Sequence, residues 1–163
     1  MDVAVFAAGC FWGVEEYFLR LPGVRSTQVG YTGGKTLEPS YEQVCRTETG
    51  HAEAVRVEFD SNEISYAELL SHFWRMHDPS SYHRQGPDIG SQYRSAIFFT
   101  NEEQRQLAEL SRSQKLAAGQ KIVTEITALE KFWPAEDYHQ QYLRKNPQAG
   151  CHIALPPLKE NSA

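Results

Sequence analysis

Apolar and polar residues alternate along the chain with two periods, which indicate strands and helices. A period of two, rich in β-branched residues, predicts strands over residues 2–8, 24–30, 51–59, 93–100 and 123–128. Apolar residues at helical spacing, together with helix-start signals, predict helices over residues 13–21 and 41–45, after capping boxes at Ser65 and Thr100, and from Pro134 through Arg144.

The order of these segments predicts the architecture. Strands alternate with helices, and some neighbouring strands are close enough to pair antiparallel, which is typical of two packed layers. We expect an α+β fold: a two-layer α/β sandwich with a mixed sheet and a ferredoxin-like core, in a single domain over residues 1–163. Residues 145–163 show no period and are predicted to form an irregular tail. The long segment over residues 78–92 is typical of a functional loop.

The strand over residues 51–59 places a carboxyl group on an apolar face. Every second residue of a strand shares a face, so Glu53 lies with Val55, Val57 and Phe59. A carboxyl group that loses its hydration has a raised pKa and can donate a proton near neutral pH. A glutamate that reaches solvent at the strand end is the alternative that the pattern leaves open.

Length and charge narrow the class of protein. The chain has 163 residues, enough to bury a core without disulfides. Acidic residues outnumber basic ones by 21 to 16 and no basic run occurs, which argues against a nucleic-acid partner. No apolar run is long enough for a membrane span, and no signal peptide is recognisable. We therefore expect neither nucleic acid nor membrane as a partner, and a cytoplasmic location unless the chain is a fragment of a larger exported protein. We also expect a monomer.

The cysteines indicate redox chemistry rather than a structural framework. Cys10, Cys45 and Cys151 are odd in number and widely spaced, without a CxxC pair, which is not the pattern of a secreted disulfide scaffold or a zinc site. His72 and His77 are five residues apart, off a single helical face, and no HExxH motif occurs. We expect reactive thiols, no metal and no other cofactor.

The segment GCFWG holds the strongest candidate nucleophile. Cys10 lies where the first strand ends and a helix begins, and such a position can lower the pKa of a thiol from ~8.5 to about 3.5–7.5. Gly9 and Gly13 allow a tight turn and close approach of a substrate. Phe11 and Trp12 could form a wall for a small apolar group such as a methyl. A buried structural cysteine beside two core aromatics is the alternative.

Three further side chains could join this thiol. Tyr41 and Tyr93 could donate hydrogen bonds to a substrate, and Asp88 lies in the long loop. Each tyrosine by itself is more typical of ordinary packing, and a turn residue is the alternative for Asp88.

Four ordered blocks of the sequence together resemble the methionine sulfoxide reductase A family. The blocks are GCFWG; GYTGG followed by YEQVC and TGHAEAV; HDPSSYHRQGPDIGSQYRSAIFF; and FWPAEDYHQQYLRKNPQAGC. They run over nearly the whole chain. The resemblance implies reduction of the S epimer of methionine sulfoxide, free or in oxidised proteins, with thioredoxin as reductant and no cofactor.

The resemblance also implies a catalytic role for five residues. Cys10 would be the attacking thiolate and Glu53 the acid. Tyr41 and Tyr93 would bind the sulfoxide oxygen. Cys151, in the tail, would be the resolving cysteine that forms a disulfide with Cys10.

Substrate contacts are implied for a second set of residues. Phe11 and Trp12 would hold the sulfoxide methyl, and Asp88 would lie at the rim of the pocket. His139 and Tyr142 would belong to the surrounding shell. Cys45 would be structural.

The chain departs from the family pattern in places, and rival functions remain open. Arg46 and Thr47 follow Cys45 where the family usually has a Ser/Thr-Gly pair, and Pro87 replaces a small polar residue. The tail lacks a further recycling cysteine. A thiol peroxidase would share the thiol chemistry but needs no methyl pocket. A redox sensor or a module that binds methionine-containing peptides would not turn over.

Overall fold

The computed structural model of the chain describes residues 1–150 and 153–159. Its main sheet has six strands in the order β7-β6-β1-β3-β2-β8. These strands are β1 (Asp2–Ala8), β2 (Val24–Thr32), β3 (Ala52–Phe59), β6 (Ser95–Phe99), β7 (Glu125–Ala128) and β8 (Trp133–Pro134). A small second sheet pairs β4 (Arg84–Gln85) with β5 (Asp88–Ile89).

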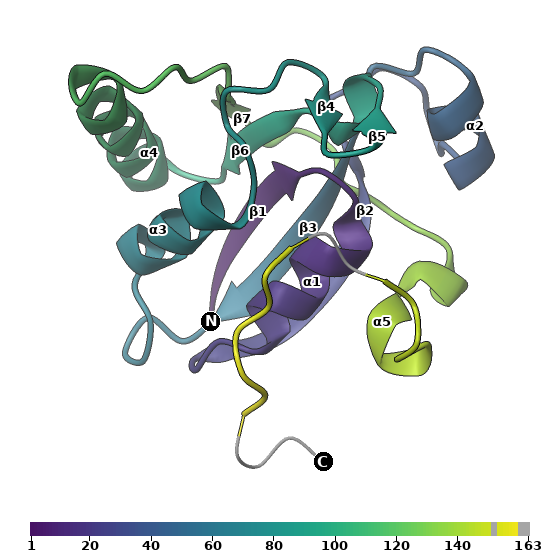
Figure 1. The fold of residues 1–163 in the computed structure, drawn as a ribbon, viewed down its shortest axis with the longest axis horizontal. Coiled ribbons are helices and arrows are strands. Elements are labelled where there is room, and N and C mark those ends of the chain that lie inside the picture. The colour runs from purple at the N-terminus through teal and green to yellow at the C-terminus, as the bar shows by residue number, and fades with distance from the viewer. Residues whose placement is uncertain (151–152, 160–163) are drawn as a thin grey trace.

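The helices are short apart from two. They are α1 (Phe11–Leu19), α2 (Tyr41–Arg46), α3 (Tyr66–Met76), α4 (Glu102–Ala117) and α5 (Tyr142–Lys145), with 3₁₀ turns η1 (Ser91–Tyr93) and η2 (Asp137–His139). α1 and α3 lie against one face of the sheet, and α4 packs beside β6 and β7 (Figure 1). None of the helices in the described part of the chain is long and apolar enough to cross a membrane.

The core topology is the ferredoxin-like one. In chain order β1, α1, β2, β3, α3 and β6 form a β-α-β-β-α-β unit whose strands lie in the order β6-β1-β3-β2, all neighbours antiparallel. β7 then adds parallel to β6, which makes the sheet mixed. The predicted two-layer α+β architecture is confirmed.

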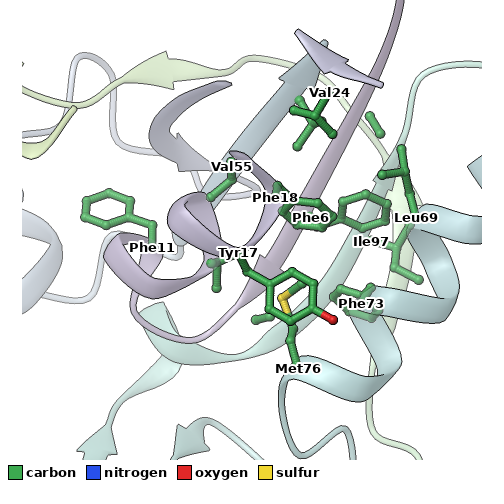
Figure 2. Packing of buried hydrophobic residues seen from close by; sticks show 14 of the residues in the cluster. Phe6, Phe11, Tyr17, Phe18, Val24, Val55, Leu69, Phe73, Met76 and Ile97 are labelled. Atoms are coloured by element: carbon green, nitrogen blue, oxygen red, sulfur yellow. The ribbon is translucent and has the colours of Figure 1, made fainter. Parts of the chain in front are cut away.

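A stack of aromatic rings joins the sheet to its helices. The ring of Phe6 in β1 lies 5.3 Å from that of Phe18 in α1 and 5.3 Å from that of Phe73 in α3 (Figure 2). All three side chains are fully buried. Truncating a core phenylalanine to alanine typically costs about 3–5 kcal/mol, because both burial and packing are lost. This cluster fixes α1, and with it the residue at the start of α1, against the sheet.

The predicted start of α4 is off by one residue. Asn101, not Thr100, is the N-cap, and its side chain accepts a hydrogen bond from the backbone N–H of Gln104 at 2.9 Å. The backbone N–H of Thr100 instead donates to the side chain of Gln104 at 3.0 Å. Asn101 has the three-residue spacing that an N-cap requires, and asparagine caps at least as well as threonine. The predicted capping box at Ser65 is confirmed.

The predicted helix from Pro134 through Arg144 is wrong. Trp133 and Pro134 instead pair with β2 as the edge strand β8, and the backbone N–H of Ala135 donates to Val29 O at 2.9 Å. Proline, which lacks an N–H, is compatible with an edge strand as well as with a helix start. Gln141 has a left-handed backbone (φ 53°), which separates η2 from α5.

The segment after α5 is irregular, as predicted. Residues 146–150 and 153–159 form no helix or strand. Cys151, the expected resolving cysteine, lies outside the described residues.

Candidate active site

Cys10 lies at the junction of β1 and α1. It is the N-cap of α1, which begins at Phe11 rather than at residue 13, so Phe11, Trp12 and Gly13 form the first helical turn. Gly9 before it has a φ of 98°, and a Cβ there would lie 2.9 Å from the Cβ of Gln85. Only glycine suits this turn. The predicted placement of the thiol at a strand-to-helix turn is confirmed.

Glu53 is a buried carboxyl group directly beside this turn. Its side chain is 1% exposed, and Oε1 accepts a hydrogen bond from the backbone N–H of Phe11 at 3.2 Å. Oε2 is buried without a hydrogen-bond partner among the described residues. The pKa of Glu53 is raised to about 8: burial is the main cause, the hydrogen bond from the Phe11 N–H opposes it, and the charge of Asp88 adds to it. Glu53 therefore remains largely protonated near neutral pH, and the solvent-exposed alternative is excluded.

Tyr41 and Tyr93 are distant in the sequence, but both lie near Glu53. Tyr41 begins α2 and Tyr93 ends η1, and both are half-buried. Burial, followed by the charge of Glu53, raises the pKa of each phenol. Both hydroxyls therefore stay protonated and can donate hydrogen bonds.

The thiol of Cys45 is a neighbour of both tyrosines. Cys45 belongs to α2 and is exposed as a residue. Shielding of its sulfur from solvent raises the pKa of the thiol, while hydrogen bonds with Tyr41 and Tyr93 lower it and the charge of Glu53 raises it. The net direction is upward, which disfavours the thiolate.

His139 organises the aromatic side chains next to Cys10. It is 1% exposed, and its Nδ1 accepts a hydrogen bond from the indole N–H of Trp12 at 2.9 Å. Burial lowers the pKa of His139, so the neutral ring is favoured. Tyr142 stacks on the face of the Trp12 indole, with the two ring centres 3.8 Å apart. Stacking on its face and a hydrogen bond at its edge thus hold the Trp12 indole in one orientation.

A cavity of about 330 Å³ opens beside Cys10. Trp12 and Asp88 line it, as do Met76 from the end of α3 and Gln85 from β4. Phe11 does not line this cavity: it is buried, and its ring packs against those of Tyr31, Tyr41 and His139. Two of the predicted substrate contacts therefore border open space next to the thiol, whereas Phe11 lies behind it.

The chain on both sides of Cys151 reaches the same cavity. Gly150 and Ile153 are among its lining residues. Within residues 1–150 and 153–159, no three His, Cys, Asp or Glu side chains are arranged to hold a metal ion.

Glu136 belongs to the site but was not identified from the sequence. Its carboxylate accepts hydrogen bonds from the Tyr31 hydroxyl at 2.9 Å and from the Tyr41 backbone N–H at 3.0 Å. Burial opposes ionisation, but these bonds and the backbone N–H of Glu136 itself outweigh it and lower the pKa of Glu136. Glu136 thus ties the start of α2, and with it Tyr41, to the C-terminal block. Its place within FWPAEDYHQQYL, three residues before His139, is the signal that could have revealed it.

Comparisons with known proteins agree with this geometry. The family model described as peptide methionine sulfoxide reductase matches residues 2–163. A peptide methionine sulfoxide reductase MsrA from Methanosarcina acetivorans is 55% identical over 148 residues, which are 89% of this chain and 79% of the relative.

Solved structures of similar sequence share the fold. Methionine sulfoxide reductase A of Corynebacterium diphtheriae has a TM-score of 0.84 at 38% identity, over 93% of this chain and 77% of that one. Reduced Mxr1 from Saccharomyces cerevisiae has a TM-score of 0.85 at 35% identity, over 92% of this chain and 88% of that one. Mxr1 has also been solved in complex with Trx2. The chain belongs to the peptide methionine sulfoxide reductase family.

Proposed function

We propose that this chain reduces the S epimer of methionine sulfoxide, free or in oxidised proteins, to methionine. The observation that carries the proposal is the buried carboxyl group of Glu53, hydrogen-bonded to the residue after Cys10, with a pKa of about 8. A sulfoxide oxygen leaves poorly unless it is protonated, so the reaction requires an acid and a nucleophile together. Cys10, at the start of α1, supplies the nucleophile, and Glu53, on the neighbouring strand β3, supplies the acid.

In the reductase step, Cys10 attacks the sulfoxide sulfur. The partial positive charge at the start of α1 favours the thiolate form of a residue in the N-cap position. Glu53 gives its proton to the sulfoxide oxygen as the sulfur–oxygen bond breaks. The protonated oxygen then passes from the substrate sulfur to Cys10 as the transient bond between the two sulfurs breaks, and methionine leaves. Cys10 becomes a sulfenic acid and loses the two electrons that the sulfoxide sulfur gains.

The neighbouring side chains orient the sulfoxide. Tyr41 and Tyr93 donate hydrogen bonds to its oxygen, since both phenols stay protonated. Trp12, which borders the cavity, holds the methyl, and Asp88 lies at the rim. Phe11 acts indirectly, because its buried ring supports Tyr41 from behind.

His139 and Tyr142 complete the substrate pocket through Trp12. The hydrogen bond from the indole to His139 and the stacking of Tyr142 fix the orientation of the indole ring. Their role is to position this ring rather than to transfer a proton.

In the second step, the Cys151 thiol condenses with the sulfenic acid of Cys10. A disulfide and water form, and thioredoxin returns the pair to thiols by exchange. The complex of the relative Mxr1 with Trx2 supports this reductant. We place the cycle in the cytoplasm, whose reducing conditions maintain thiols, and assign it to residues 1–163 as a single catalytic domain.

An assay with the two separate epimers of methionine sulfoxide tests the proposal. With thioredoxin, thioredoxin reductase and NADPH, we expect turnover of the S epimer alone, because methyl, oxygen and peptide are held on three sides of a chiral sulfur. Equal rates on both epimers would contradict the pocket assignment. Faster turnover of hydrogen peroxide than of either sulfoxide would favour a thiol peroxidase instead.

A further inference from the structure

Two consecutive carboxyl groups are buried on α1, and the reductase step uses neither. Glu15 is 1% exposed and Glu16 is 3% exposed, on the helix whose N-cap is Cys10. A buried carboxylate is costly unless it is paired and hydrogen-bonded. The partners of Glu15 and Glu16 therefore indicate what these residues are for.

Glu15 binds the chain just before α5. Its Oε1 accepts a hydrogen bond from the backbone N–H of Gln141 at 2.7 Å, and its Oε2 accepts one from the Thr27 hydroxyl at 2.7 Å. Gln141 has φ 53° and ψ 42°, a left-handed conformation that is uncommon for residues other than glycine. Glu15 thus holds this turn, which directs the chain into α5 and the tail.

Glu16 lies between two arginines. Oε2 is 2.8 Å from Nε of Arg20 on the same helix, and Oε1 is 3.0 Å from Nε of Arg144 in α5. The guanidinium of Arg20 also donates to the carbonyl oxygen of Pro156 at 2.8 Å. The network formed by Glu16, Arg20 and Arg144 therefore contacts the chain both before and after residues 145–155.

The described chain after residue 152 lies beside α1 and is bonded to the C-cap of that helix. Figure 1 shows the yellow C-terminal chain passing in front of the purple helix, and the bond from Arg20 to Pro156 joins them. Gly150 and Ile153, between the two anchors, line the cavity that Cys10 borders. Lys159, further on, donates to Val24 O at 2.9 Å and extends the second anchor.

We propose that Glu16, Arg20 and Arg144 are positioning residues for the resolving step: they hold the chain before and after residues 145–155 to α1, and this tether speeds capture of the Cys10 sulfenic acid by Cys151. The inference rests on the proposed function. The chemistry is condensation of the Cys10 sulfenic acid with the Cys151 thiol, which forms the S–S bond and releases water. Its rate depends on the effective concentration of one group near the other, which falls when a tether end is released.

Single-turnover kinetics separates the two steps. Pre-reduced protein receives S-methionine sulfoxide without thioredoxin, and methionine release and thiol loss are followed in the same samples. Arg20→Gln removes the anchor at Pro156, and Arg144→Gln removes the anchor at α5. We expect each to release methionine at the wild-type rate but to form the disulfide about tenfold more slowly or worse. A 1,3-dione reagent should trap the accumulating sulfenic acid on Cys10.

Two further variants serve as controls. Arg105 pairs with Glu102 and Glu109 on the exposed side of α4, and Arg105→Gln removes an arginine without touching the tail. It should match wild type in both steps. Arg144→Lys keeps the charge next to Glu16 and should recover part of the rate of disulfide formation, although it lacks the planar fork of arginine.

The outcomes separate this inference from the function on which it rests. Disulfide formation at the wild-type rate in both Arg20→Gln and Arg144→Gln would overturn the inference alone. So would an equal slowing of methionine release and disulfide formation, since that indicates a general structural effect. A wild-type protein that releases no methionine would overturn the proposed function itself.

Discussion

The carboxyl group of Glu53 accepts a hydrogen bond from the backbone N–H of Phe11 at 3.2 Å, and Phe11 directly follows Cys10. The proposed acid and the proposed nucleophile are therefore linked through one peptide unit. The two groups need opposite environments: a helix N-terminus favours the thiolate, and burial keeps the carboxyl group protonated. The antiparallel pairing of β1 with β3 supplies both, since it brings the start of β3 beside the end of β1.

Replacing Glu53 with glutamine should slow the reductase step while leaving the fold intact. The amide fills the same volume but cannot give a proton to the sulfoxide oxygen. We expect the rate of methionine release in a single turnover to fall by about 10²–10⁴. Circular dichroism checks the fold, and a release rate equal to that of wild type would show that Glu53 is only structural.

The reductase step should also slow as the pH rises through about 8, the raised pKa of Glu53. Only the protonated carboxyl group can act as the acid, so loss of its proton removes the activity. In Glu53→Gln this alkaline decrease should be absent from the residual rate. The single-turnover rate measured from pH 6 to pH 10 decides this, and an identical profile in the variant would assign the titration to another group.

The raised pKa of Glu53 also makes the free energy of unfolding decrease as the pH rises. An unfolded glutamate has a pKa of about 4.3, so the folded chain binds more protons at Glu53 than the unfolded chain does above that pH. The contribution of Glu53 to the free energy of unfolding is complete below the unfolded pKa. It declines as the pH rises, until the folded pKa of about 8 is passed. Comparing urea unfolding of wild type and Glu53→Gln across this window isolates the contribution.

The features that could be predicted from the sequence are those set by local pattern. The alternation of β3 places Glu53 on the same face as Val55 and Val57, and both valines are fully buried. Gly9 of GCFWG marked the turn before α1 correctly, whereas Gly13 lies in the first turn of the helix itself. These predictions needed only the periods of strand and helix and the backbone freedom of glycine.

The features that could not be predicted depend on partners far away in the chain. Pro134 suits a helix start and an edge strand equally, and only the free edge of β2 selects the strand. Glu15 and Glu16 resemble a solvated pair until Gln141 and Arg144, more than a hundred residues later, are placed against them. Their burial follows from tertiary contacts that no local window contains.

Replacing His139 with phenylalanine should lower the catalytic efficiency on sulfoxide substrates, because His139 fixes the orientation of Trp12. The indole N–H of the half-buried Trp12 would lose its acceptor, and an unpaired buried donor costs about 1–3 kcal/mol at most sites. If the whole of this free energy is lost from the transition state, kcat/KM for S-methionine sulfoxide falls about 5- to 150-fold. His139→Gln, whose side-chain oxygen can still accept the bond, is the matched control and should lose less. Equal losses in the two variants would mean that ring packing, not the hydrogen bond, fixes Trp12.

The cysteines test the whole cycle, because each has a different predicted fate. Pre-reduced protein given excess methionine sulfoxide and no reductant should fall from about three free thiols to about one, since the chain has three cysteines and the disulfide consumes two. Cys151→Ser should release about one methionine per chain and then stall as a sulfenic acid, because the reductase step precedes resolution. Cys10→Ser should release none. Mass spectrometry of peptides after one turnover should identify a disulfide between Cys10 and Cys151.

The surviving thiol should be that of Cys45, and its surroundings give the reason. Shielding of the sulfur raises the pKa of Cys45 despite hydrogen bonds with Tyr41 and Tyr93, so little thiolate is available to attack a sulfenic acid. Cys45→Ser should therefore complete both steps at close to the wild-type rates, with a disulfide unchanged in the peptide map. A mapped disulfide that includes Cys45 would instead assign the resolving role to the thiol beside the two tyrosines, and Cys151→Ser would then continue to turn over with thioredoxin.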